Sequence, residues 1–229
     1  MFPAYSDEVE IRSGSVILKG ILRIPRDARG AVLFAHGSGS GRLSPRNRFV
    51  AERLQRAKLA TLLFDLLTEK EEQEDALTGW YRFDIPFLVK RLVGVSDWFS
   101  ERTVSSFPVG YFGASTGAAA ALVAATERLA TVRAVVSRGG RPDLAGDDTL
   151  AAVQVPTLLI VGEGDPEVLE VNRHSLELIP ALHKKLVVVP NAGHLFEEPG
   201  ALEEVADQAA AWFETHLEHV LESQPGFFP

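Results

Sequence analysis

The sequence contains no cysteine among its 229 residues. Disulfide bonds, thiol nucleophiles and cysteine-ligated metal sites are therefore excluded. A chain without cysteine suits a reducing compartment, so we expect a cytoplasmic location. Residues 1–8 lack the basic stretch followed by an apolar stretch that defines a secretory leader, and we expect no signal peptide.

Basic residues are also sparse, since 23 Lys and Arg stand against 31 Asp and Glu and give a formal net charge of -8. No block of basic residues stands out, so we expect neither a nucleic acid nor an anionic membrane surface as partner. The longest stretch of low charge, residues 107–126, is interrupted by Gly, Ser and Thr. It favours a buried strand, turn and helix over a membrane span.

Apolar runs and helical spacing alternate along the chain. Residues 8–11 and 15–24 predict an antiparallel pair of strands. Continuous apolar runs then predict buried strands at 31–35, 60–65, 109–114, 132–137, 157–161 and 185–189. Helical patterns lie at 48–59, 85–99, 116–129, 166–178 and 201–221, with a short helix near 148–153. This alternation predicts an α/β fold, a mostly parallel sheet with helices on both faces, in a single domain over 1–229.

Two segments stand apart from this alternation. Residues 68–75 are polar and acidic, and we interpret them as a solvated, mobile excursion above the sheet. Residues 224–229 form an apolar tail that either packs on the surface or mediates a contact.

Gly113, Ser115 and Gly117 form the pattern G-x-S-x-G between an expected strand and an expected helix. A serine at the tip of such a turn has a strained backbone, so the residues two before and two after it must lack bulk. Its hydroxyl is exposed above the first amides of the helix, which favour negative charge. Ser115 is the predicted nucleophile, and a simple helix N-cap is the alternative.

An acid and a base follow two further strands. Asp165 comes after the strand at 157–161, and His194 after the strand at 185–189. A histidine within reach of a serine takes its proton, and a carboxylate fixes the histidine tautomer. Asp165 also precedes Pro166 as a helix N-cap would. Asp143 is a rival acid because it too follows a strand end.

The loop at 37–41 is rich in glycine but lacks the lysine of a phosphate-binding loop and the G-x-G-x-x-G spacing. We therefore expect it to supply an oxyanion donor, the amide of Ser38, together with the amide of Thr116. His36, Gly37 and Arg138 are candidates for the substrate pocket. Arginines near the site (Arg138, Arg141 and those within 44–48) either bind an acidic substrate group or lie on the surface.

These motifs together, His36-Gly37-Ser38, Gly113–Gly117, Gly162–Asp165 and Asn191–His194, resemble the α/β-hydrolase superfamily. Within it the chain is most similar to the small, lid-poor branch related to dienelactone hydrolases and their serine esterase relatives, over about residues 16–217. The resemblance implies eight strands with the second antiparallel, a Ser115–His194–Asp165 triad, no large lid, and no cofactor or metal. Dienelactone hydrolases proper typically use a cysteine nucleophile, which this chain does not contain.

The expected function is that of a serine hydrolase. It would cleave a small carboxylic ester, lactone or thioester through an acyl-enzyme on Ser115, with His194 as general base and Asp165 orienting it. The alternatives are acyl transfer or another reaction on the same triad, and a catalytically inactive hydrolase-like fold that binds a ligand. We expect a monomer or a small homo-oligomer.

Overall fold

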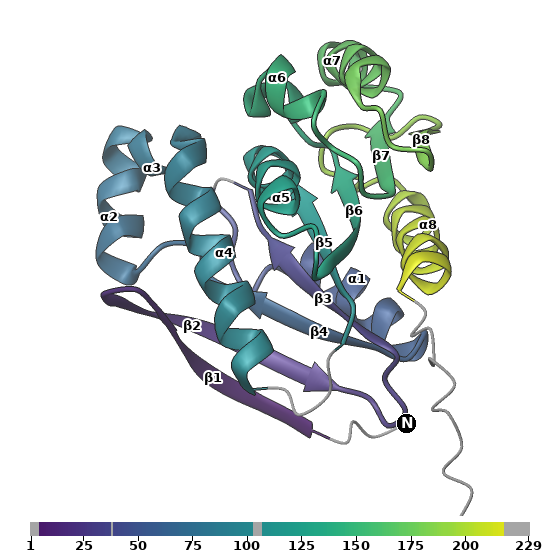
Figure 1. Cartoon of the computed structure of the whole chain (residues 1–229). Coiled ribbons are helices and arrows are strands. Elements are labelled where there is room, and N and C mark those ends of the chain that lie inside the picture. Colours follow the sequence, from purple (N-terminus) through teal and green to yellow (C-terminus); the bar gives the residue numbers. More distant parts are fainter. Residues whose placement is uncertain (1–4, 38, 103–106, 218–229) are drawn as a thin grey trace, which may run out of the picture.

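A computed structural model describes residues 5–37, 39–102 and 107–217 of the chain. One eight-stranded sheet runs through it, in the order β1-β2-β4-β3-β5-β6-β7-β8 (Figure 1). β2 pairs antiparallel with β1 and β4, and the remaining pairs are parallel. The strands are β1 (Tyr5–Ser13), β2 (Val16–Ile24), β3 (Gly30–Ala35), β4 (Leu59–Phe64), β5 (Val109–Ala114), β6 (Val132–Arg138), β7 (Thr157–Gly162) and β8 (Lys184–Val189).

Helices cover both faces of this sheet (Figure 1). One face packs on α1 (Pro45–Arg56) and α8 (Ala201–His216), and together they enclose one apolar core. The other face packs on α4 (Ile85–Arg102), α5 (Thr116–Glu127), α6 (Asp147–Leu150) and α7 (Pro166–Leu178), with a 3-10 turn at Pro142–Ala145. β3 to β7 are buried on both faces, which explains their continuous apolar runs.

The chain between β4 and α4 corrects one prediction. Residues 68–75 are not an irregular excursion: Thr68 is the N-cap and residues 69–75 are part of α2 (Glu69–Thr78), which is followed by the short α3 (Trp80–Phe83). Thr68 and Glu71 form a capping box that begins α2. Asp75 is only 4% exposed, and Glu71 pairs with Arg91 of α4. The acidic run is therefore helical, and it is anchored at Glu71 and Asp75 while most of its other side chains stay exposed, as expected.

The last helix ends at His216 with Leu217 as its C-cap, and residues 218–221 of the predicted 201–221 helix and the 224–229 tail lie outside the described residues. Within the described ranges, none of the helices combines the length and apolarity needed to cross a bilayer.

Candidate active site

Ser115 stands at the carboxyl end of β5, directly before α5. Its φ of 51° and ψ of -124° place it in a backbone region that L-residues rarely adopt. The side chain makes no capping hydrogen bond to α5, so the N-cap interpretation does not hold. The turn instead presents a half-buried hydroxyl above the first helical amides.

The two flanking glycines of the turn permit close backbone contacts. A Cβ on Gly117 would lie 2.2 Å from the Ala35 carbonyl oxygen, and one on Gly113 would lie 2.5 Å from the Ala118 Cα. Any side chain at either position would collide with backbone atoms. The sequence pattern is thus explained by packing of β5 and α5 against β3.

His194 and Asp165 are brought together from two different loops. The His194 Nδ1 lies 2.6 Å from the Asp165 Oδ2, although the two residues are 29 positions apart in sequence. Asp165 makes no capping bond to α7, so its carboxylate serves the histidine instead. The His194 ring lies next to Gly139, where a Cβ would be 3.7 Å from its Cε1. Ser115 is hydrogen-bonded to the loop after β6 that contains Gly139, since Arg141 N donates to the Ser115 carbonyl oxygen at 3.1 Å.

Ser115 and His194 share no hydrogen bond in this structure, whose described residues include both side chains. Such contacts are commonly long before a substrate is bound. Asp143, the rival acid, is engaged elsewhere: its carboxylate accepts from the Arg141 Nε at 2.8 Å and from Nη2 at 2.6 Å.

Two glutamates that the sequence analysis did not single out fix the loop that carries His194. Asn191 N donates to the Glu163 Oε2 at 2.9 Å, and Gly193 N donates to the Glu198 Oε1 at 3.0 Å. The position of Glu163, two residues before Asp165, was the available signal. No sequence pattern pointed to Glu198, because its hydrogen bond to Gly193 depends on how the irregular chain after His194 turns back.

His36 is buried, and both ring nitrogens are engaged by backbone. Its Nδ1 lies 2.9 Å from the Gly37 carbonyl oxygen, and its Nε2 lies 2.8 Å from the Leu66 N. Since a carbonyl only accepts and an amide only donates, the proton is on Nδ1 and Nε2 accepts. Burial lowers the pKa of His36, which favours this neutral form. His36 thus shapes the loop and has no free nitrogen with which to act as a base.

The structure describes only one of the two expected oxyanion donors. Thr116 is the first residue of α5, so its amide belongs to the first turn that lacks acceptors within the helix. Ser38 lies outside the described residues. Gly37 before it packs on the elbow, since a Cβ there would lie 2.8 Å from the Ser115 Cβ.

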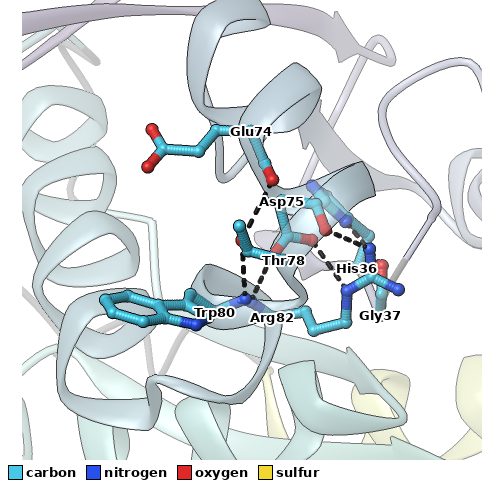
Figure 2. A network of polar contacts seen from close by, with 7 residues as sticks. All are labelled: His36, Gly37, Glu74, Asp75, Thr78, Trp80 and Arg82. Carbon is cyan, nitrogen blue, oxygen red and sulfur yellow. Dashed lines mark hydrogen bonds and ion pairs between the residues drawn. The ribbon is translucent and has the colours of Figure 1, made fainter.

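A cavity of about 110 Å³ opens beside the elbow, between the β3 and β4 loops and the α2–α3 segment. Asp75 and Arg82 form one wall, where Asp75 accepts from the Arg82 Nε at 2.8 Å and from its amide at 3.0 Å (Figure 2). The apolar and glycine lining includes Gly37, Leu66, Leu67 and Leu88, and the polar lining includes His36, Asp65, Glu72 and Thr116. The described residues contain no cluster of three or more His, Asp or Glu side chains that could hold a metal ion.

Solved structures place this arrangement in a family. A dienelactone hydrolase from Anabaena variabilis is 56% identical to the chain, with a TM-score of 0.90 over 93% of this chain and 99% of that one. The chain belongs to the dienelactone hydrolase-like α/β hydrolases. The resemblance drawn from the motifs is confirmed, as are the eight strands with an antiparallel second strand. In the described part of this α/β hydrolase, no large lid follows β6.

Other matches to this dienelactone hydrolase-like chain are more distant or partial. Est1E from Butyrivibrio proteoclasticus has a TM-score of 0.75 at 15% identity and shows the shared fold alone. A Mycobacterium tuberculosis protein, provisionally named a phosphoribosyl transferase, is 55% identical over 216 residues, which are 94% of this chain. The chain spans only 47% of that relative's length. No protein-family model matches the chain.

Proposed function

We propose that the protein is a serine hydrolase that cleaves a small carboxylic ester, lactone or thioester. Ser115 Oγ attacks the acyl carbon while His194 Nε2 takes its proton, and Asp165 holds the imidazole in the required tautomer. The bond to the leaving group breaks as His194 returns the proton to it. Water, deprotonated by His194, then attacks the acyl carbon, and the bond to Ser115 Oγ breaks as His194 returns the proton to Oγ and the acid leaves.

The contact of 2.6 Å between His194 and Asp165, beside a serine with positive φ, carries this proposal. The alternative is that His194 and Asp165 form only a surface ion pair. That alternative does not explain why both residues and the Ser115 turn lie at the carboxyl edge of the sheet. The Thr116 amide supports an oxyanion hole, with the Ser38 amide proposed as the second donor. Removal of one such donor typically costs about 3–4 kcal/mol of transition-state stabilisation.

The cavity supports a small, uncharged acyl group. Its volume of about 110 Å³ is little for a bulky or long-chain acid. Asp65 is paired with Arg42 and Asp75 with Arg82, so Glu72 leaves the lining with a net negative charge that an anionic acyl group would meet. Short-chain esters and small lactones fit both the size and the charge.

Acyl transfer to an acceptor other than water is the second candidate, because an alcohol or thiol can attack the same acyl-enzyme on Ser115. The transferase name of the Mycobacterium tuberculosis relative refers to phosphoribosyl transfer, a different chemistry. That relative is about twice as long as the region it shares with this chain, so its name can describe the other half. Product analysis with a competing alcohol or thiol separates acyl transfer from hydrolysis.

A fluorophosphonate probe tests the proposal directly. It should label wild type, and Ser115→Ala should remove both labelling and turnover of 4-nitrophenyl acetate. Ser40→Ala, which changes a serine lining the cavity beside the elbow, is the matched control and should still be labelled. Equal labelling of Ser115→Ala would end the nucleophile assignment, and an inert wild type that still binds a ligand would favour a binding protein.

A further inference from the structure

Arg138 is the last residue of β6, adjacent to the nucleophile. It pairs with Ala114 in the β5–β6 ladder, and Ser115 N lies 3.4 Å from its carbonyl oxygen. Adjacent strands lie about 4.8 Å apart, so the Arg138 side chain starts one strand spacing from the elbow. Side chains alternate along a strand, which puts Arg138 on the face of Val136, toward α1.

The guanidinium of Arg138 is buried without a partner. The residue is only 8% exposed, and its Nη1 is enclosed with no hydrogen-bond acceptor. Among the described residues, no carboxylate forms an ion pair with it. A buried cation normally has a counter-ion, because an unpaired one loses its hydration without compensation.

The surroundings of Arg138 are positive rather than negative. Burial, followed by the charge of Arg46, lowers the pKa of Arg138 to about 10, so the group stays charged at neutral pH. Arg46, in the first turn of α1, has an Nε that is also buried without an acceptor. Its Nη1 reaches Glu197 at 3.2 Å, a carboxylate that is well exposed. One positive charge is left without a counter-ion.

The position of His194 identifies the part of the substrate that would face Arg138. Gly139 follows Arg138 directly and lies against the His194 ring. In the proposed function, on which this inference rests, His194 protonates the leaving group. The cavity on the other side of the elbow is lined by Glu72 and by two carboxylates already paired with arginines, and its remaining negative charge suits the neutral acyl half.

We propose that Arg138, with Arg46 beside it, forms a subsite for a carboxylate carried on the leaving group of the substrate. A guanidinium binds a carboxylate through two parallel hydrogen bonds, and one unpaired positive charge matches one negative charge. The substrate class is thus a neutral acyl ester of a hydroxy acid.

Two esters with the same acyl group test this subsite: 4-acetoxybenzoate, whose leaving group is anionic, and its neutral methyl ester. The measured quantity is the ratio of their kcat/KM values. Arg138→Met should lower this ratio roughly 10- to 100-fold, as expected for a charge-assisted hydrogen-bonded pair. Arg138→Lys should lower it less. Arg133→Met removes an exposed arginine of the same strand and should leave the ratio unchanged.

An unchanged ratio in Arg138→Met would overturn the proposed subsite. The hydrolase proposal would still stand if turnover of the neutral ester depended on Ser115. Turnover that persists in Ser115→Ala would overturn the hydrolase proposal instead. Calorimetry keeps the subsite testable without turnover. Wild type should bind 4-hydroxybenzoate roughly tenfold or more tightly than its methyl ester, and equal affinities would contradict the subsite. Melting curves identify a variant that fails to fold. In that case, the affinities of wild type for the two ligands decide whether the subsite exists.

Discussion

At the scale of single residues, the backbone of Ser115 is held in a strained conformation. A non-glycine residue in this region stores roughly 1–3 kcal/mol of strain, and Ser115 has φ at 51°. Ser115→Gly should therefore raise the free energy of unfolding by about 1 kcal/mol, after the greater unfolded-state entropy of glycine is deducted. Urea denaturation measures this. Ser115→Ala keeps the Cβ and the strain, so equal stability of the two variants would mean that the turn stores none.

The choice of acid is tested by two matched substitutions. Asp165→Asn should lower kcat roughly 10³- to 10⁴-fold, because an amide cannot stabilise the imidazolium or select its tautomer. Asp143→Asn loses only its pair with the half-exposed Arg141 and should change kcat less than about threefold. Steady-state kinetics on 4-nitrophenyl acetate compares them, and the reverse ranking would make Asp143 the acid.

His36 makes the stability of the loop after β3 depend on pH. Its pKa in the folded state lies below the ordinary 6.5 because of burial, so the unfolded chain binds a proton first as the pH falls. This contribution to stability is present above about pH 6.5 and is lost as the pH falls toward the lower folded pKa. The loss between pH 8 and 5 should be smaller in His36→Gln than in wild type. Urea unfolding at both pH values checks this, and the exposed His174→Gln should behave as wild type.

At the scale of elements, α2 and α3 form a wall of the cavity that depends on one buried ion pair. Asp75→Asn removes a nearly enclosed charge opposite Arg82 and should destabilise the fold by roughly 1–3 kcal/mol and raise KM. Lys19→Met also removes a link to α2, but its pair with Glu69 is exposed, so little should change. Thermal melting and ester kinetics are the measurements. Equal effects of the two variants would show that Asp75 has no special role in the wall.

The elements that could be predicted from sequence are those whose signal is local. Continuous apolar runs identified the strands from β3 to β8, and the glycines around Ser115 predicted the turn between β5 and α5. α2 was missed although the capping box at Thr68 was readable, because the acidic charges dominated the interpretation. Contacts between distant segments were not readable, such as Glu71 with Arg91 of α4 or Arg46 with Glu197.

The same distinction applies to the candidate site. Ser115, Asp165 and His194 could each be proposed from the end of a strand, because parallel strands present their carboxyl ends at one edge. Their catalytic roles stay predictions. The burial of Arg138 could not be foreseen, since it depends on how α1 and the histidine loop close over the end of β6.

At the scale of the whole molecule, the described fold contains the proposed acid, base and nucleophile. The two apolar cores cover both faces of the sheet, and the Anabaena variabilis chain is matched over 99% of its length. We therefore expect this chain alone to hydrolyse 4-nitrophenyl acetate in a Ser115-dependent way. We also expect it to release no diphosphate from phosphoribosyl diphosphate and a nucleobase. The reason is that we attribute the transferase name of the longer relative to the half that this chain does not span.

A coupled assay for diphosphate, run beside the ester assay on the same preparation, checks both expectations. Ser115→Ala separates them, because it should stop ester hydrolysis and leave any diphosphate release unchanged. Diphosphate release by the chain alone would place transferase chemistry within this fold and contradict the division of the relative into two halves. Ester turnover without it would assign hydrolysis to the shared half, where Ser115, Asp165 and His194 lie.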